Sequence, residues 1–216
     1  TRNNAGMLEV VFSGNYARAC KQRTLYRRVS DAQDHYQHFF LPLWNQICGS
    51  VDGKITQGIV PADAKRLLEE SSISLAEAVR LVNKFSNNVM TRQILLSLGA
   101  QVFGPPGTTD KGIAAVNAWL VEHKLDHPGL QLDKGAGLSR DARISAGLLG
   151  ELLLHVYKLA YMPEFIAALP VSGYDGTMAN RFNDTPLVGH AHIKTGLLDF
   201  VQSMAGYVTT ATGKRY

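Results

Sequence analysis

The feature that most limits the fold of this chain is a helical pattern interrupted by polar residues in NKFSNNVMTRQ, residues 83–93. Ser74 and Glu77 form a capping box that predicts the start of a helix. Apolar residues keep helical spacing on both sides of the interruption: Leu75, Val79, Val82 and Phe85 before it, and Val89, Met90, Ile94, Leu95 and Leu98 after it. The triplet Ser86-Asn87-Asn88 is therefore predicted to lie at a helix junction. Ser and Asn commonly cap helices at such junctions, so the triplet alone indicates no function.

The other periodicities predict both helices and strands. Helices are expected from Ser30 to Gly49, with a kink or break at Pro42, from Gly112 to His123 after a loop at residues 102–112, and over residues 144–160. Short strands are expected over residues 8–12 and 54–60, and two more, joined by a turn near residues 197–199, over residues 190–196 and 203–214.

Composition excludes several classes of protein. With 216 residues, of which 45% are hydrophobic and 19% charged, the chain is long enough for one sizeable core. No apolar run approaches the roughly 20 residues of a membrane span, and the N-terminus lacks the pattern of a signal peptide. The first residue is not Met, so we expect that an upstream segment was removed or never included. The net charge is +4, but the basic residues are scattered along the sequence, and no motif indicates nucleic-acid binding.

The two cysteines do not identify a compartment. Cys20 and Cys48 can pair or remain free, and two cysteines fit either an oxidising or a reducing environment. We expect that they do not form an essential pair within this chain.

A second polar triplet follows about a hundred residues later. Lys194, Thr195 and Gly196 end a predicted strand, where glycine allows a backbone or ligand to approach closely. Alone, this triplet is equally typical of a solvated strand end. Together, Ser-Xaa-Asn followed by Lys-Thr-Gly matches two of the three motifs of β-lactamases and penicillin-binding proteins, the third being Ser-Xaa-Xaa-Lys.

Four segments in order carry a family resemblance: VNKFSNNVMTRQ, GAGLSRDARIS, SGYDGTM and HIKTGLLDFVQSMAGYV. They resemble the C-terminal part of the D-alanyl-D-alanine carboxypeptidase/endopeptidase penicillin-binding proteins, the type with domains inserted in a transpeptidase-like fold. Two departures stand out. Ala136 replaces a serine that the family usually has, and no serine of this chain is followed three positions later by lysine. The pair that comes nearest to the Ser-Xaa-Xaa-Lys motif is Thr108 with Lys111, which is typical of a polar loop before a helix.

The resemblance implies an α/β (α+β) fold of the β-lactamase/transpeptidase type, an antiparallel sheet packed with helices and incomplete at both ends. Residues 1–70 would be the end of an inserted domain and the return to the catalytic domain. Residues 71–216 would be the C-terminal part of that catalytic domain. The nucleophile would then lie in a missing N-terminal part of the same protein, and this chain alone would be inactive.

The resemblance also implies roles for the two triplets. Ser86 would join the proton network between nucleophile and leaving amine, and Asn88 would orient the substrate amide. Lys194 would attract the substrate carboxylate, to which Thr195 would add a hydroxyl bond. Gly196 and Leu197 would complete the substrate site, with the Leu197 N–H in the oxyanion hole. The implied partners are peptidoglycan peptides and β-lactams, in the periplasm and without a cofactor. The alternative is a peptidoglycan-binding or scaffold module that has lost the nucleophile.

Four further features carry open alternatives. Asp133 and the loop at residues 135–140 resemble a segment near the active-site cleft of the family. Alternatively, the loop is a glycine-rich connection to the next helix, in which Arg140 and Arg143 bond backbone carbonyls. Asp175 either caps the residues that follow it or contacts substrate. Strand alternation puts His190 and His192 on the face of Lys194, so His192 is a candidate for the cleft. A metal site would need a third ligand at suitable spacing, and none is evident, so we predict no metal.

Overall fold

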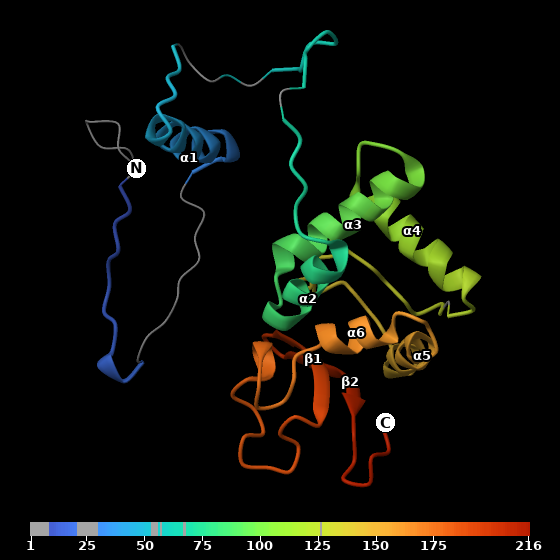
Figure 1. Cartoon of the computed structure of the whole chain (residues 1–216). Helices are drawn as coiled ribbons and strands as arrows, with labels where there is room; N and C mark the ends of the chain where they lie inside the picture. The colour runs from blue at the N-terminus through green and yellow to red at the C-terminus, as the bar shows by residue number, and fades with distance from the viewer. Residues whose placement is uncertain (1–8, 21–29, 53–55, 57, 67, 126) are drawn as a thin grey trace. The chain divides into compact units, whose positions relative to one another are not determined.

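The computed structural model describes residues 9–20, 30–52, 56, 58–66, 68–125 and 127–216. The chain divides into two compact units, Thr1–Glu69 and Glu70–Tyr216, whose elements are drawn in Figure 1. Every residue of the predicted site belongs to the second unit. That the first unit ends an inserted domain stays a prediction.

The first unit contains the 3-10 helix η1 (Arg18–Cys20) and the helix α1 (Ala32–Gln46). The expected cap at Ser30 is wrong by one position, because the Asp31 carboxylate accepts the Asp34 N–H at 2.8 Å. A carboxylate at this end also complements the helix dipole. The helix continues through Pro42 without a break. Rings at successive turns stack along it, Tyr36 on Phe40 and Phe40 on Trp44.

The two strands expected in the first unit are not found among its described residues. Leu8 and residues 54, 55 and 57 lie outside the described part of the chain, and residues 9–12, 56 and 58–60 form no strand. A β-prone run becomes a strand only when a neighbouring strand accepts its hydrogen bonds, which local propensity does not reveal. Cys20 and Cys48 are both free and exposed, as expected.

The second unit begins with helices and ends with a hairpin: α2 (Leu75–Phe85), α3 (Asn88–Phe103), α4 (Thr109–Glu122), α5 (Ala146–Tyr157), α6 (Met162–Ala168), the 3-10 helix η2 (Gly176–Met178), β1 (Ala191–Leu198) and β2 (Val201–Val208). Each of the first four helices of this unit has an N-cap whose side chain accepts the backbone N–H three residues later. These N-caps are Ser74, Asn87, Thr108 and Ser145. The sequence pattern missed α6, η2 and the Thr108 cap that starts α4 three residues early.

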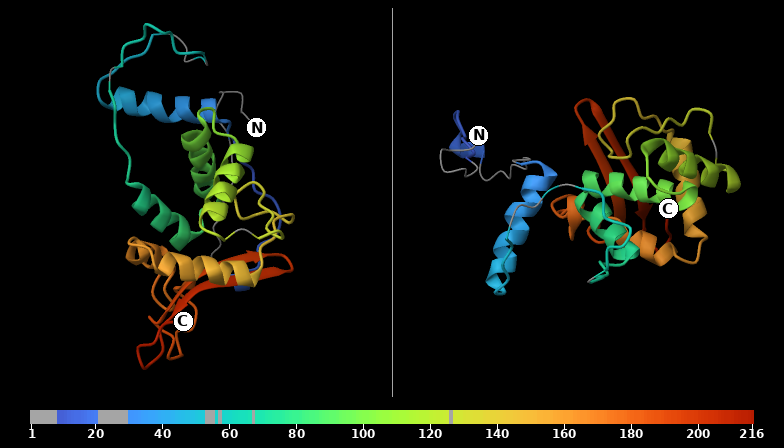
Figure 2. Two further views of the ribbon diagram at one scale, coloured as in Figure 1. Left: turned by 90° about the vertical axis from the view of Figure 1, so that its right-hand side faces the viewer. Right: turned by 90° about the horizontal axis from the view of Figure 1, so that it is seen from above.

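The sheet is an antiparallel hairpin with helices over one face. Strands β1 and β2 pair from Ala191 opposite Val208 to Leu198 opposite Val201. On the other edge of β1, the Ile193 N–H donates to Pro170 O at 2.8 Å and the Ser172 N–H to Ala191 O at 2.9 Å. Helices α5 and α6 lie over the hairpin in the views of Figures 1 and 2. The predicted α+β architecture, an antiparallel sheet packed with helices, is confirmed.

Two apolar clusters pack the elements of this unit together, the first between α4 and α5 and the second between the helices and the hairpin. The first is built from Leu120, Leu125 and Leu148, and the second from Ile166, Leu169 and Tyr207. The Tyr207 hydroxyl donates to Leu153 O at 2.6 Å, so it is satisfied although buried. Burial raises the pKa of Tyr207, with a further contribution from the neighbouring Tyr157. The second cluster therefore fixes the hairpin against α5 and α6.

Candidate active site

Ser86 lies at the predicted helix junction in a constrained conformation. It is the C-cap of α2, with φ 54° and ψ 50°, and its N–H donates to Val82 O. For a residue with a side chain, the left-handed region costs roughly 1–2 kcal/mol, so surrounding contacts must hold it. The next residue, Asn87, caps α3 by accepting the Met90 N–H at 3.0 Å. The chain thus turns from one helix into the next at Ser86.

Lys194 brings the two polar triplets together across 108 positions of sequence. Its Nζ donates to Ser86 Oγ at 3.1 Å and to Thr195 O at 2.8 Å. The side chain is half-buried, and burial lowers the pKa of Lys194. A cation in a partly dry site attracts an anion more strongly than it would in water. The pair therefore combines a positive charge with a hydroxyl.

Two further bonds hold the triplets in place. Asn88 Nδ2 donates to Ala136 O at 2.5 Å, which joins the start of α3 to the loop before α5. The Thr195 hydroxyl lies 3.2 Å from the Thr177 hydroxyl of η2. Thr177 was not anticipated, because nothing local in SGYDGTM signals a partner in β1. Both triplets are thus bonded to segments that the family resemblance also singled out.

The backbone of β1 beyond Lys194 presents polar groups away from β2. Along an antiparallel strand, successive N–H and C=O groups alternate between its two edges. Ala191 O and Ile193 N–H bond on the edge opposite β2, so alternation puts the Thr195 and Leu197 groups on that edge too. Gly196 faces a different constraint: a Cβ there would lie 2.6 Å from Ser203 Oγ of β2. The close approach at this glycine therefore comes from the paired strand.

A cavity of about 610 Å³ adjoins these residues. Its polar lining includes Lys194, Thr195, Asp133, Lys134 and Ser139, and its apolar lining includes Leu132, Ile144, Leu149, Leu152 and Phe165. Gly196 and Leu197 also line it, whereas Ser86 and Asn88 are not among the lining residues. Ser86 is bonded to the lining residue Lys194, and Asn88 is bonded to Ala136, which lies between the lining residues Gly135 and Gly137. A concave apolar wall with a few convergent polar groups is the usual form of a small-molecule site.

In the loop at residues 133–143, both arginines bond backbone carbonyls, which was one of the two alternatives predicted for this segment. Arg143 donates to Arg140 O at 2.6 Å and to Ala142 O at 2.9 Å. Arg140 donates to Asp199 O at 3.2 Å, in the turn of the hairpin. These bonds to carbonyls confirm that reading of the arginines. Asp133 still lines the cavity, as the resemblance implied.

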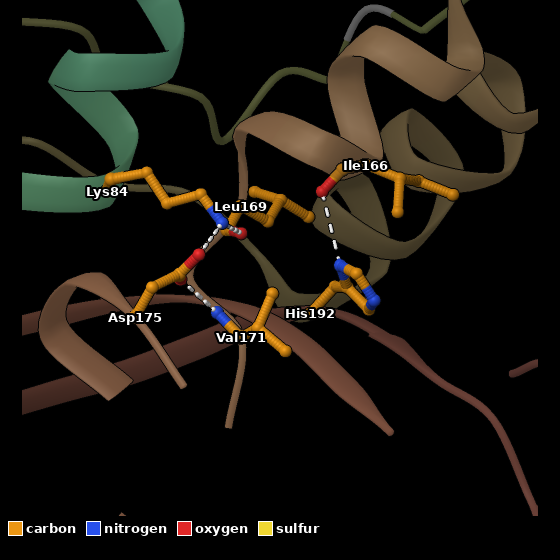
Figure 3. A network of polar contacts seen from close by, with 6 residues as sticks. All are labelled: Lys84, Ile166, Leu169, Val171, Asp175 and His192. Atoms are coloured by element: carbon orange, nitrogen blue, oxygen red, sulfur yellow. Dashed lines mark hydrogen bonds and ion pairs between the residues drawn. The ribbon is translucent and has the colours of Figure 1, made fainter. Parts of the chain in front are cut away.

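Asp175 makes no side-chain bond that caps the residues after it, so the capping alternative is wrong. Its carboxylate instead accepts the Val171 N–H at 2.8 Å and the Lys84 ammonium at 2.6 Å, as Figure 3 shows. Lys84 also donates to Leu169 O at 2.7 Å and is only 11% exposed. Sequence reasoning missed Lys84, because a lysine in the last turn of an amphipathic helix usually points into solvent.

His192 is absent from the residues that line the cavity, which corrects the expectation that it approaches the cleft. Its Nδ1 lies 3.3 Å from Ile166 O in α6 (Figure 3). Burial lowers the pKa of His192, and the charge of Lys84 lowers it further. Among the described residues, no group of three or more His, Cys, Asp or Glu side chains is arranged to hold a metal.

Solved structures define the class of this fold. Penicillin binding protein 4 of Haemophilus influenzae, in complex with a β-lactam, matches with a TM-score of 0.75 at 22% identity, over 87% of this chain and 44% of that one. The same protein in a second crystal structure matches with a TM-score of 0.60 at 24% identity, over 64% of this chain and 31% of that one. The fold is therefore that of transpeptidase-like penicillin-binding proteins.

Sequence comparison identifies the family. The profile described as the D-Ala-D-Ala carboxypeptidase 3 (S13) family matches residues 2–216, so the chain belongs to this family. The D-alanyl-D-alanine carboxypeptidase of Actinomadura sp. (strain R39) is 32% identical over 199 residues, 88% of this chain and 37% of that protein. Carboxypeptidase DacB of Mycolicibacterium smegmatis is 30% identical over 154 residues, 68% of this chain and 33% of that protein. The chain thus spans about a third of the length of these relatives.

Proposed function

We propose that this chain is part of a serine D-Ala-D-Ala carboxypeptidase/endopeptidase that acts on peptidoglycan stem peptides and is acylated by penicillin. The observation that carries the proposal is the 3.1 Å bond between Lys194 Nζ and Ser86 Oγ beside an apolar cavity. It combines a cation for the substrate carboxylate with a hydroxyl that can donate and accept protons. Membership of the S13 family supports the same reaction.

The reaction is an acyl transfer in two steps. A serine Oγ attacks the carbonyl carbon between the two D-alanines, and the C–N bond breaks. The serine proton passes to the amine of the departing D-alanine. Water then attacks the ester, which releases the peptide acid and restores the serine. A β-lactam forms the same ester, but its amine remains tethered after ring opening.

The residues of this chain would serve these steps as follows. Lys194 attracts the terminal carboxylate, and Thr195 adds a hydroxyl bond to it. The Leu197 N–H, on the open edge of β1, donates to the developing oxyanion. Gly196, next to it, lines the cavity without a side chain that would project from the strand. Ser86 relays the proton to the leaving amine. Asn88 orients the substrate amide through its Oδ1, since its Nδ2 already donates to Ala136 O.

The nucleophile would come from the rest of the longer parent protein. No serine in the chain has a lysine three positions later. The closest pair, Thr108 and Lys111, has structural bonds: Thr108 caps α4, and Lys111 Nζ donates to Gly104 O and Pro106 O. The proposed organisation therefore has residues 1–70 as the end of an inserted domain and residues 71–216 as part of the catalytic domain.

The proposed location is the periplasm, where peptidoglycan stem peptides are accessible. In the described part of the chain, no helix has the length and apolar character to cross a membrane. Beyond the peptide substrate and β-lactams, the proposed partner is the remainder of the parent protein. No nucleic acid or cofactor enters the proposal.

Intact-mass spectrometry after incubation with labelled penicillin tests the function. The parent protein is expected to gain one penicillin mass, and the 216-residue chain alone to gain none. An adduct on the chain alone would refute the upstream nucleophile and direct attention to Thr108. A folded parent that binds peptidoglycan but forms no adduct would instead favour the non-catalytic module.

A further inference from the structure

The segment between α6 and β1 contains a polar connection that the proposed reaction does not use. Lys84, two positions before Ser86, sends its ammonium across to residues 169–175. There it meets Leu169 O at 2.7 Å and the Asp175 carboxylate at 2.6 Å. Asp175 in turn accepts the Val171 N–H at 2.8 Å. Figure 3 shows these groups converging from α2 and from the segment after α6.

The same segment is bonded to β1 on its far side. Pro170 O accepts the Ile193 N–H at 2.8 Å, immediately before Lys194. Further along, the Thr177 hydroxyl lies 3.2 Å from that of Thr195, immediately after Lys194. The residues on both sides of Lys194 are thus held by the segment to which Lys84 bonds.

Backbone packing brings this segment directly against the end of α2. A Cβ at Gly176 would lie 2.3 Å from Lys84 O, and Gly176 itself has φ +55°. Only glycine combines this conformation with so close an approach. Ser86, whose own left-handed backbone needs support, follows two residues after this contact.

We infer that the Lys84–Asp175 pair is a positioning device that sets the Ser86 hydroxyl against the Lys194 ammonium. Ser86 follows α2, whereas Lys194 lies in β1. The Lys84–Asp175 pair bonds the end of α2 to residues 169–177, and these residues bond β1 on both sides of Lys194. Neither Lys84 nor Asp175 is among the residues that line the cavity, so in this inference they act through Ser86. The inference rests on the proposed acylation by penicillin.

The charge pattern indicates which substitution is the cleaner test. Lys84 is 11% exposed and Asp175 44% exposed. Lys84→Met removes the buried ammonium and leaves a carboxylate that water can reach. Asp175→Asn keeps an acceptor for the Val171 N–H but leaves the ammonium buried without its counter-charge, which is the more damaging loss. Lys84→Met is therefore the primary variant.

The experiment measures penicillin acylation of the parent protein under saturating conditions, which separates the acylation rate constant from the dissociation constant of the first complex. K84M is expected to lower the rate constant at least 10-fold and to change the dissociation constant less than 3-fold. Glu151→Gln, which removes the carboxylate charge from an exposed contact with His127 in the same unit, is expected to change neither. Leu148→Ala, a buried residue of the other apolar cluster, controls for loss of stability alone.

The route through Ser86 is tested in the S86A background. K84M is expected to lower the acylation rate constant there by less than 3-fold, because the hydroxyl that the pair positions is gone. An equal loss in both backgrounds, an unchanged rate constant in K84M, or an equal loss in L148A would each overturn the inference. If S86A itself forms no adduct over hours, the comparison of K84M with L148A decides. A wild-type parent without an adduct would refute the proposed function, and the inference with it.

Discussion

Replacing Lys194 by alanine should slow penicillin acylation of the parent protein by roughly 100- to 1000-fold. The ammonium is half-buried and bonded to Ser86 Oγ at 3.1 Å. A carboxylate about 4 Å from such a charge gains about 4 kcal/mol at an effective dielectric constant of about 20. Removal of one preorganised donor costs a comparable amount, about 3 to 4 kcal/mol. At about 1.4 kcal/mol for each factor of ten, the stated range follows.

The assay is a time course of labelled penicillin incorporation at pH 7, followed by intact-mass spectrometry. Lys194→Arg, which keeps the positive charge, is the matched control and should retain more activity than K194A. The pH dependence gives a second readout. Because burial lowers the pKa of Lys194, wild-type acylation should decline as pH rises through a value below 10.5, whereas K194A should lack that decline. A loss below 10-fold in K194A, or the same alkaline decline in both proteins, would refute the reasoning.

Three further outcomes are expected. Ser86→Ala should slow acylation by roughly 100-fold through loss of a proton-relay hydroxyl, with the urea midpoint little changed; a normal rate would contradict the relay. Ser172→Ala should destabilise the protein by about 2 to 5 kcal/mol, since the fully buried hydroxyl donates to Leu187 O and accepts the Ala191 N–H, and urea unfolding against the exposed Ser71→Ala checks this. His192→Gln should reduce the acid loss of stability: burial holds the folded pKa below 6.5, so the unfolded state binds the proton first and stability falls as pH drops below 6.5. Thermal midpoints from pH 7.5 to 5 that fall equally in both proteins would contradict it.

The helix junction could be predicted because its causes are local. The Ser74 cap bonds the Glu77 N–H three residues away, and the Asn87 cap bonds the Met90 N–H at the same spacing. The β1–β2 hairpin could also be predicted from the sequence, because its two strands are adjacent along the chain. Short-range hydrogen bonds leave a signature within a few residues, although the Thr108 cap of α4 was missed and the cap of α1 was placed one residue too early.

The missed features depend on residues far apart in the chain. Lys84 and Asp175 are 91 positions apart, and neither neighbourhood signals the other. Capping of the following residues was one of two alternatives for Asp175, because aspartate commonly caps helices, but the ammonium and the Val171 N–H bond to its two oxygens. The short helix α6 was missed for a different, local reason: it has no side-chain cap bond and only seven residues.

The bond between Lys194 and Ser86 also constrains where the Ser86 proton can go. An ammonium has three donors and no acceptor, so Ser86 Oγ must accept from Lys194 while that lysine is charged. The hydroxyl proton of Ser86 is then left for another acceptor, and in the proposed reaction the departing amine would be that acceptor. Burial opposes the charge on Lys194, whereas its bonds to Ser86 Oγ and Thr195 O favour the charge. A bound substrate carboxylate would stabilise the charged form of Lys194. Ser86 Oγ would then continue to accept from Lys194, which leaves the Ser86 proton for the leaving group.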